Sequence, residues 1–329
     1  MKPVTWGVLS VASHFVGRIN TNVRKSPLNV VQAISSRSME RAKAAASRLG
    51  IPRAYGSYAD LLADKEIEAV YIPLPNKFHA EWVKKAADAG KHVLCEKPFA
   101  MNAEEAQEAF DYGKRKGVLV MESLMYRFHP QWIRAGEIVR DGELGEIHAV
   151  NAFFSYMIPD PGNVRNIPEI GGGGMRDVGS YCVSAARFLM GVEPKRVLAL
   201  MHRDPGLKTD TLSTGVLDFG KARSVFTVGT QTQAWQQVDV IGSGGRLTVH
   251  IPFNANPDTP AEITVTAWNG TRTVYTPVAD QFVEVFDAFS RAVRAGGPVP
   301  QPPEDTVANQ KVLDALFKSE KSGTWESLR

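Results

Sequence analysis

Short apolar runs alternate with amphipathic segments along the first third of the chain. The apolar runs predict strands over 4–9, 30–34, 69–72, 92–95 and 118–121. The segments between them have helical spacing, to about residue 24 and then over 38–49, 58–63, 76–89 and 102–116. Strands that alternate with helices indicate βαβ units and a parallel sheet.

The pattern changes after about residue 122. Helices are expected over 130–140, 175–189, 283–294 and 306–318, and a long strand over 147–157. Residues 196–274 are mostly strand-like, with Gly, Asp and Asn at the turns, which predicts a meandering and largely antiparallel sheet. We therefore expect two domains, a parallel α/β domain over 1–122 and an α+β domain over 123–329.

Net charge, apolar runs and cysteine positions limit the kinds of protein that this chain could be. The 329 residues include 38 Lys and Arg against 35 Asp and Glu, a net charge of +3 without a basic run, which disfavours a nucleic-acid surface but allows a small anionic ligand. No apolar run approaches a membrane span, and the N-terminus does not resemble a signal peptide. Cys95 and Cys182 lie far apart, which is typical of reduced thiols. We expect a cytoplasmic protein with a small-molecule partner.

The turn after the first strand holds candidate cofactor residues. A dinucleotide fingerprint has glycines where this chain has Ser10 and Ala12, and its third glycine is absent. Small residues still allow backbone N–H groups of Ser10, Val11 and Ala12 to approach a pyrophosphate at the helix N-terminus. An ordinary strand-to-helix turn explains the same residues equally well.

The end of the second strand bears on which dinucleotide would bind. In an NAD site an acidic residue near this point holds the ribose 2′-hydroxyl. Here the chain offers Ser36, Arg37 and, one turn later, Arg41. Hydroxyl and guanidinium groups suit a 2′-phosphate, which favours NADP over NAD. A solvated helix start is the alternative.

Two further strand ends carry polar residues. Pro73, Asn76 and His79 follow one strand, and a Pro-rich turn with a helix cap explains them locally. Glu96 and Lys97 close the next strand, at the carboxyl edge of the sheet where ligands bind. A lysine there can polarise a hydroxyl or lower a neighbouring pKa. A surface ion pair between the two is the simpler interpretation.

A glycine run precedes a helix in the second half of the chain. Gly171–Gly174 is costly in conformational entropy, which is explained if the backbone passes close to a ligand or another chain. Asp177 and Tyr181 are four residues apart on the helix that follows, so an acid and a phenol share one face and could transfer protons. A flexible loop followed by a half-buried tyrosine is the alternative.

Other polar and aromatic residues carry less information. We expect no metal site, because no metal-ligand spacing is present among His14, His92, His129, His148, His202 and His250. Aromatic side chains are expected to cover sheet faces at Phe153, Phe154, Tyr156 and Trp235.

Taken together, these motifs resemble the glucose–fructose oxidoreductase and inositol dehydrogenase family, the Gfo/Idh/MocA oxidoreductases, over essentially the whole chain. The order and spacing of four segments carry the resemblance. They are Pro75-Asn76-x-x-His79-x-Glu81, Glu96-Lys97-Pro98, Asn163-x-Arg165-Asn166 with the glycine run and Asp177-x-x-x-Tyr181, and Pro303-Glu304-Asp305-Thr306-x-x-Asn309.

The resemblance implies a Rossmann domain with a doubly wound parallel sheet, and a C-terminal α+β domain with a large, open, mostly antiparallel sheet. In the family that sheet commonly forms the oligomer interface, which implies a homo-oligomer, a dimer or tetramer. Nicotinamide and substrate meet between the domains, so Arg127 and Arg165 would point toward them. By resemblance Lys97 is the catalytic lysine and Asp177 lies beside the substrate.

Many family members have a histidine where Tyr181 stands. Tyr181 instead resembles the glucose–fructose oxidoreductase, aldose dehydrogenase and dihydrodiol dehydrogenase branches, in which the tyrosine is the acid/base. Two positions depart from the family pattern. The fingerprint is degenerate at Ser10 and Ala12, as in the dihydrodiol dehydrogenase branch, and Arg176 replaces a residue that is usually apolar.

The expected function is NADP-dependent hydride transfer to or from a sugar, at aldose C1 or on a keto sugar. Tyr181 would move the proton and Lys97 would favour the tyrosinate. Lys97 would contact both the cofactor and the substrate. The other residues expected to bind the cofactor are Ser10, Val11, Ala12, Ser36, Arg37, Arg41, Pro73, Asn76, His79, Glu96 and Arg127. The alternatives are a trans-dihydrodiol dehydrogenase, a 1,5-anhydrofructose reductase, a nucleotide-sugar ketoreductase and a non-catalytic NADP-binding sugar sensor.

Overall fold

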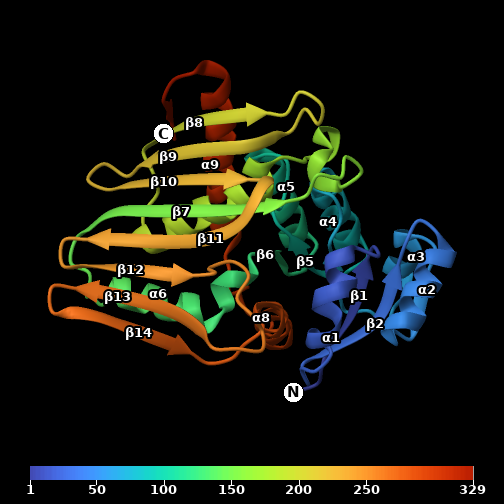
Figure 1. Cartoon of the computed structure of the whole chain (residues 1–329). Helices are drawn as coiled ribbons and strands as arrows, with labels where there is room; N and C mark the ends of the chain where they lie inside the picture. The colour runs from blue at the N-terminus through green and yellow to red at the C-terminus, as the bar shows by residue number, and fades with distance from the viewer. Residues whose placement is uncertain (329) are drawn as a thin grey trace. The chain divides into compact units, whose positions relative to one another are not determined.

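A computed structural model describes residues 1–328 and divides the chain into two compact units (Figure 1). Met1–Met125 and Phe282–Val307 form the first unit, and Tyr126–Gln281 with the residues from 308 onward form the second. The expected division at residue 122 differs from this grouping at 282–307, which pack with the N-terminal strands. Each unit contains one sheet.

The first unit is built on a six-stranded parallel sheet (Figure 1). Its order, β3-β2-β1-β4-β5-β6, confirms the doubly wound Rossmann fold. The strands are β1 (Val4–Leu9), β2 (Asn29–Ser35), β3 (Arg53–Tyr55), β4 (Ala69–Ile72), β5 (His92–Glu96) and β6 (Val120–Ser123). Strand β3 was not predicted, because three residues of intermediate burial produce no apolar run.

Capping residues set the helices of this unit. Side-chain oxygens of Ser38, Ser57 and Asn102 accept backbone N–H groups at the starts of three helices. Gly50 ends one of them at a φ of 61°, where glycine is favoured. The α-helices are α1 (Asn20–Val23), α2 (Met39–Leu49), α3 (Tyr58–Ala63), α4 (His79–Asp88) and α5 (Ala103–Arg115).

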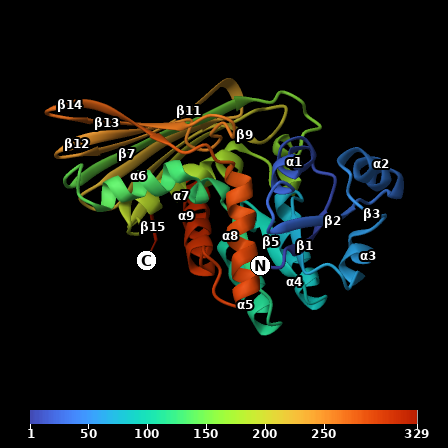
Figure 2. The same ribbon diagram turned by 90° about the horizontal axis from the view of Figure 1, so that it is seen from below.

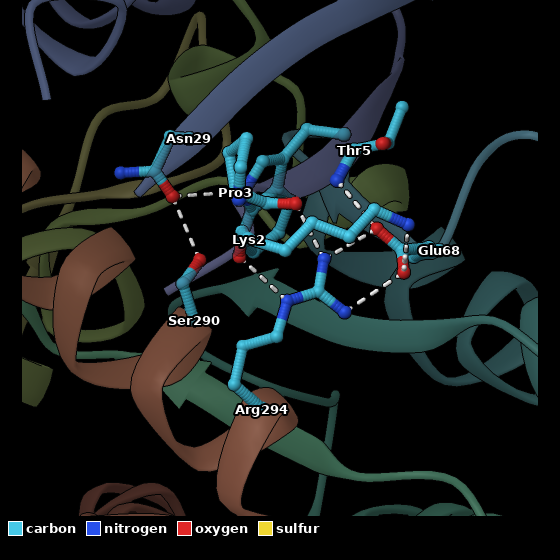
Figure 3. A network of polar contacts seen from close by, with 8 residues as sticks. Lys2, Pro3, Thr5, Asn29, Glu68, Ser290 and Arg294 are labelled. Carbon is cyan, nitrogen blue, oxygen red and sulfur yellow. Dashed lines mark hydrogen bonds and ion pairs between the residues drawn. The ribbon is translucent and has the colours of Figure 1, made fainter. Parts of the chain in front are cut away.

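Helix α8 (Gln281–Ala295) follows the second unit in the sequence but packs against the sheet of the first unit. The Trp6 ring lies 4.7 Å from that of Phe286, and its indole N–H donates to Asn29 Oδ1. The Ser290 hydroxyl donates to the same oxygen, across 261 positions of sequence (Figure 3). Tertiary contact with β1 and β2 is therefore the reason that 282–307 belong to the first unit.

The same helix carries an ion pair that makes folding pH-dependent. Arg294 donates to both carboxylate oxygens of Glu68, which also accepts the Thr5 N–H (Figure 3). Hydrogen bonding from Arg294 lowers the pKa of Glu68 to about 2, although burial opposes the shift. A lowered folded-state pKa stabilises the protein above the unfolded value of 4.5, and this stabilisation is lost as the pH falls toward 2.

We expect Glu68→Gln to lower the free energy of unfolding at pH 7 by about 1–3 kcal/mol, because the charged acceptor is lost. Denaturant unfolding should also depend less on pH between 4.5 and 2 than in the parent protein. Glu66→Gln is the control, because Glu66 pairs with Arg53 and its side chain is 65% exposed. Equal pH dependence in Glu68→Gln and the parent would contradict the assignment.

The second unit is built on a nine-stranded sheet of order β14-β13-β12-β11-β7-β10-β9-β8-β15. Its pairings are antiparallel except between β7 and β10, which confirms the expected open, mostly antiparallel sheet. The strands are β7 (Ile147–Met157), β8 (Arg196–Arg203), β9 (Asp210–Asp218), β10 (Arg223–Gly229), β11 (Gln231–Gly242), β12 (Gly245–His250), β13 (Ala261–Ala267), β14 (Gly270–Thr276) and β15 (Glu326–Ser327).

Helices cover one face of this sheet and leave the other open. Figure 2 shows α6 (Pro130–Arg140), α7 (Ser180–Met190) and α9 (Pro303–Ser322) on the same side of the strands. On the open face Leu200, Val225 and Trp235 are 78%, 40% and 59% exposed. No helix of residues 1–328 is long and apolar enough to cross a membrane.

Candidate functional site

The first strand of the Rossmann unit ends in a turn with a glycine-like backbone. Ser10 has a φ of 129°, a value at which glycine is favoured, and its hydroxyl donates to the Pro73 carbonyl at 3.3 Å. Val11 and Ala12 follow at intermediate burial. The chain then enters a π-helical turn, η1 (Phe15–Ile19), rather than a regular α-helix. Ser10 therefore has a backbone conformation that favours glycine, which is the residue that the fingerprint has at this position.

Two guanidinium groups lie beside the end of β2. Ser36 is buried, and its hydroxyl accepts the N–H of Ser38. Arg37 and Arg41 are exposed. Burial raises the pKa of the Tyr58 phenol, and the positive charges of both arginines oppose that rise, so both act at the same place. A 2′-phosphate would meet cations and hydroxyls here.

Glu96 is buried at the end of β5 rather than exposed at the surface. It is only 8% exposed, and its carboxylate accepts the Tyr71 hydroxyl at 2.6 Å and the Lys97 backbone N–H at 3.2 Å. The Tyr71 oxygen also lies 3.2 Å from Nε2 of His14, which follows the first turn. Tyr71 therefore links Glu96, which ends β5 next to Lys97, to His14, which follows the turn after β1.

His79 is fully buried between two loops. One ring nitrogen lies 2.7 Å from the Leu74 carbonyl and the other 2.9 Å from the Pro98 carbonyl. Burial lowers the pKa of this imidazole. The ring thus ties the loop after β4, which holds Pro73 and Asn76, to the loop after β5. A direct contact between His79 and a cofactor stays a prediction.

In the second unit, one carboxylate gathers two partners from other segments. Asp177 Oδ2 accepts the Tyr156 hydroxyl at 2.6 Å and Nε–H of Arg165 at 2.9 Å. Burial and the Asp177 charge raise the pKa of Tyr156, and the same charge raises that of Arg165. The arrangement presents a carboxylate, a guanidinium and a phenol, the groups that bind sugar hydroxyls.

Tyr156 joins the Asp177 cluster although no sequence motif indicated it, because it was interpreted as a cover for the sheet. The available signal was the period of a strand. Phe154 contacts the ring of Tyr181 at 5.8 Å, and Tyr156 follows two positions later on β7, hence on the same face.

Tyr181 is buried rather than half-buried. It is 5% exposed and packs against Tyr126, Phe154 and Phe253. The helix predicted over 175–189 starts as a π-helical turn, η6 (Met175–Gly179), and becomes α-helical from Ser180. From the closing Pro303–Asn309 motif, Asn309 donates to the carbonyl of Ser180, one residue before Tyr181.

The glycine run packs against the protein's own chain, and this contact explains two of its glycines without a ligand or another chain. A Cβ on Gly172 would lie 2.6 Å from the Arg165 carbonyl oxygen. A Cβ on Gly173 would lie 2.1 Å from Oδ1 of Asp210, a buried residue that no motif indicated. Side chains are therefore excluded at both positions, and the segment is not a free loop.

The remaining motif residues act locally. Asn163 accepts the N–H of Arg165, and Asn166 donates to the carbonyls of Ile158 and Asp160. This pins the loop that presents Arg165.

The two other arginines that were singled out lie over aromatic rings. The Arg127 guanidinium is 4.9 Å from the ring centre of Phe188, and that of Arg176 is 4.2 Å from the ring centre of Phe317. Phe317 on α9 thus explains a cation where the family usually has an apolar residue. A role for Arg127 toward the cofactor stays a prediction. Residues 1–328 contain no group of three or more His, Cys, Asp or Glu side chains that could hold a metal ion.

Comparison with known families gives two matches that together span most of the chain. Residues 7–124 match the oxidoreductase family with a NAD-binding Rossmann fold, GFO_IDH_MocA. Residues 132–248 match the GFO/IDH/MocA C-terminal domain.

Two relatives with a named activity cover 97% and 73% of this chain. D-xylose 1-dehydrogenase (NADP(+)) 2 from Haloferax volcanii is 39% identical over 97% of this chain and 98% of its own. Trans-1,2-dihydrobenzene-1,2-diol dehydrogenase from Macaca fascicularis is 30% identical over 73% and 72%. Among solved structures, a 3-ketoreductase from Actinomadura kijaniata in complex with NADP and TDP-benzene superposes with a TM-score of 0.91. It is 29% identical and covers 96% of this chain and 98% of that chain.

Proposed function

The chain belongs to the Gfo/Idh/MocA oxidoreductase family, and from this premise we propose that it is an NADP-dependent enzyme that transfers hydride between nicotinamide and a sugar. The first unit would bind the cofactor, and the second would hold the substrate. The substrate we favour is a free aldose that reacts at C1. One relative at 39% identity is a D-xylose 1-dehydrogenase, which supports this choice over a keto sugar.

The contact of Asp177 with Arg165 and Tyr156 carries the proposal. An aldose offers several hydroxyl groups, each of which needs a donor or acceptor in a fixed place. The three side chains are held in one geometry by bonds of 2.6 and 2.9 Å. An aromatic dihydrodiol would need an apolar pocket with only two hydroxyl contacts. The polar cluster therefore favours a sugar.

The proton would move through Tyr181. In the oxidative direction its phenolate accepts the proton of the substrate hydroxyl, and in the reductive direction its phenol returns it. Lys97 would favour the phenolate through its positive charge. The bound dinucleotide supplies the hydride acceptor or donor at nicotinamide C4. Asp177, with Arg165 and Tyr156, would orient the sugar.

The residues at the end of β2 fit NADP. Arg37 and Arg41 would recognise a ribose 2′-phosphate together with Ser36, and two of the similar proteins, the D-xylose 1-dehydrogenase and the 3-ketoreductase, support NADP because one is named as an NADP(+) enzyme and the other is an NADP complex. The glycine-like backbone of Ser10 fits the approach of a pyrophosphate at the first turn.

We expect Arg37→Ala to weaken NADP+ binding roughly tenfold or more and to leave NAD+ binding nearly unchanged, because a charge-assisted contact to the 2′-phosphate is lost. Dissociation constants for both cofactors, from fluorescence titration, check this. Arg48→Ala is the control, because Arg48 is exposed at the opposite end of α2. If the binding of NADP+ and of NAD+ weakened equally, Arg37 would not recognise the 2′-phosphate.

A substrate panel tests the function. The purified protein should reduce NADP+ faster with pentoses or hexoses than with an aromatic dihydrodiol, and it should not reduce a TDP-keto sugar or 1,5-anhydrofructose efficiently with NADPH. Mass spectrometry of denatured protein checks for retained cofactor, which would hide turnover of added NADP+. If the protein oxidised the dihydrodiol and no sugar reacted, a dihydrodiol dehydrogenase would replace the proposal. If it bound NADP but turned over no substrate, a non-catalytic sugar sensor would be favoured.

We also propose that the protein is a homo-oligomer that uses the open face of the second sheet. Exposed apolar side chains on this face, such as Leu200, Val225 and Trp235, would be covered there. Sedimentation equilibrium should show a dimer or tetramer, and Leu200→Glu should shift it toward monomer. An unchanged assembly in that variant would exclude this part of the face.

A further inference from the structure

Asp210 is a buried carboxylate outside the set of motifs. It begins β9, is 1% exposed, and its Oδ2 accepts the Met175 N–H at 2.6 Å and the Ser213 hydroxyl at 2.7 Å. Burial raises its pKa, and these two hydrogen bonds oppose the rise. A carboxylate is costly to bury, and the two neutral donors together with the positive charge of Arg203 offset only part of that cost, since the pKa of Asp210 is still raised. Its presence needs a reason beyond packing.

The glycine run is shaped around this carboxylate. Gly173 has a φ of 122°, and Oδ1 of Asp210 occupies the space that a Cβ there would need. On the other side of the run, the Gly173 N–H donates to the Arg165 carbonyl at 2.8 Å. One glycine therefore contacts Asp210 directly and is also bonded to the backbone of Arg165.

The Met175 N–H, which Asp210 accepts, lies at the start of the helical turn that carries Asp177. Met175 is the first residue of η6, and the Asp177 N–H donates to the Gly173 carbonyl at 3.0 Å. The Asp177 carboxylate then meets Arg165 Nε–H at 2.9 Å. Asp210 is thus linked to both members of this ion pair, to Asp177 through Met175 and Gly173 and to Arg165 through Gly173.

We propose that Asp210 is a positioning residue for sugar recognition, which holds the glycine run and η6 so that Asp177, Arg165 and Tyr156 meet in one geometry. The inference rests on the proposed function only for its kinetic consequence. Asp210 touches neither substrate nor cofactor in this role. It explains why the chain has glycine at 173, where a side chain would displace the carboxylate.

The test compares Asp210→Asn with Asp218→Asn. Asp218 ends the same strand, is 7% exposed, and pairs with Arg196. Asp210→Asn keeps the size of the side chain but replaces the carboxylate, and we expect the KM for the sugar to rise about tenfold or more while NADP+ affinity stays unchanged. Misplacement by about 1 Å can cost about 10²-fold in rate. Asp218→Asn should alter neither value.

A second measurement reports on the geometry without turnover. Tyrosine labelled with ¹³C at Cζ gives a Tyr156 signal, assigned with Tyr156→Phe, that depends on the hydrogen bond to Asp177. The signal should move in Asp210→Asn and in Gly173→Ala, and stay in Asp218→Asn. Amide exchange at Met175 should also quicken in Asp210→Asn.

The two readouts separate the two proposals. If the parent protein turns over no sugar, the proposed function fails, and the Tyr156 signal alone decides the role of Asp210. An unmoved Tyr156 signal with parental exchange at Met175 overturns the positioning role. A parental sugar KM despite a moved signal also overturns it, because the geometry would then not govern recognition. Equal effects in Asp218→Asn would assign the changes to β9 as a whole.

Discussion

Tyr181→Phe is expected to lower kcat for the preferred sugar by about 10²–10⁴-fold, because it removes the only ionisable atom of the proposed acid/base. The ring and its contacts with Phe154 and Phe253 remain, so folding should be unaffected. NADP+ affinity should hardly change, since the phenol is assigned to the substrate. Steady-state rates, with single-turnover rates to isolate the chemical step, measure the effect.

Tyr126→Phe is the matched control. Tyr126 lies in the same aromatic cluster, 5.8 Å from Tyr181 between ring centres, and its hydroxyl bonds to Ser184 Oγ. Loss of that hydroxyl should reduce stability slightly and leave kcat within a few-fold of the parent. If Tyr181→Phe instead behaves like this control, the proton must leave by another group, and Tyr181 serves packing alone.

Arg165→Ala is expected to lower kcat/KM for the sugar by about two orders of magnitude and to leave NADP+ affinity unchanged. The substitution removes a hydrogen-bonded partner of Asp177, whose side chain is 14% exposed, and losses of this kind cost about 2–5 kcal/mol. The carboxylate would then be free to turn toward other donors. Initial rates over a sugar concentration series, with a cofactor titration, separate the two effects.

Arg196→Ala provides the comparison for this prediction. Arg196 also donates through Nε to an aspartate, Asp218, at 2.8 Å, but its side chain is 52% exposed against 35% for Arg165. Its removal should leave turnover intact. An Arg165→Ala enzyme with parental kcat/KM would show that the ion pair supports the loop and not the sugar.

Local chemistry made much of the fold predictable. The helices predicted over 38–49, 58–63 and 102–116 are all present, and each starts next to a residue that caps its own first turn, Ser38, Ser57 or Asn102. Strands β1 and β4 were placed to the residue, since both are buried on two faces and are continuously apolar or nearly so.

The parts that the sequence did not reveal depend on distant contacts. Asp210 meets Met175 across 35 positions, and no short motif records such a pairing. The return of 282–307 to the first sheet likewise rests on contacts such as Ser290 with Asn29. Lys97 and Tyr181 were singled out by their positions in the sequence and given roles by resemblance, whereas the contact of Tyr156 with Asp177 appeared only in the structure.

The return of helix α8 has a consequence for how the chain acquires its structure during synthesis. Trp6 is synthesised long before its partners Phe286 and Phe289. The N-terminal sheet must wait, with part of its apolar surface uncovered, until helix α8 has been made. Translation therefore completes the second unit's long sheet strands before the first unit can close, and a ribosome that stops early releases an N-terminal fragment that exposes its own core.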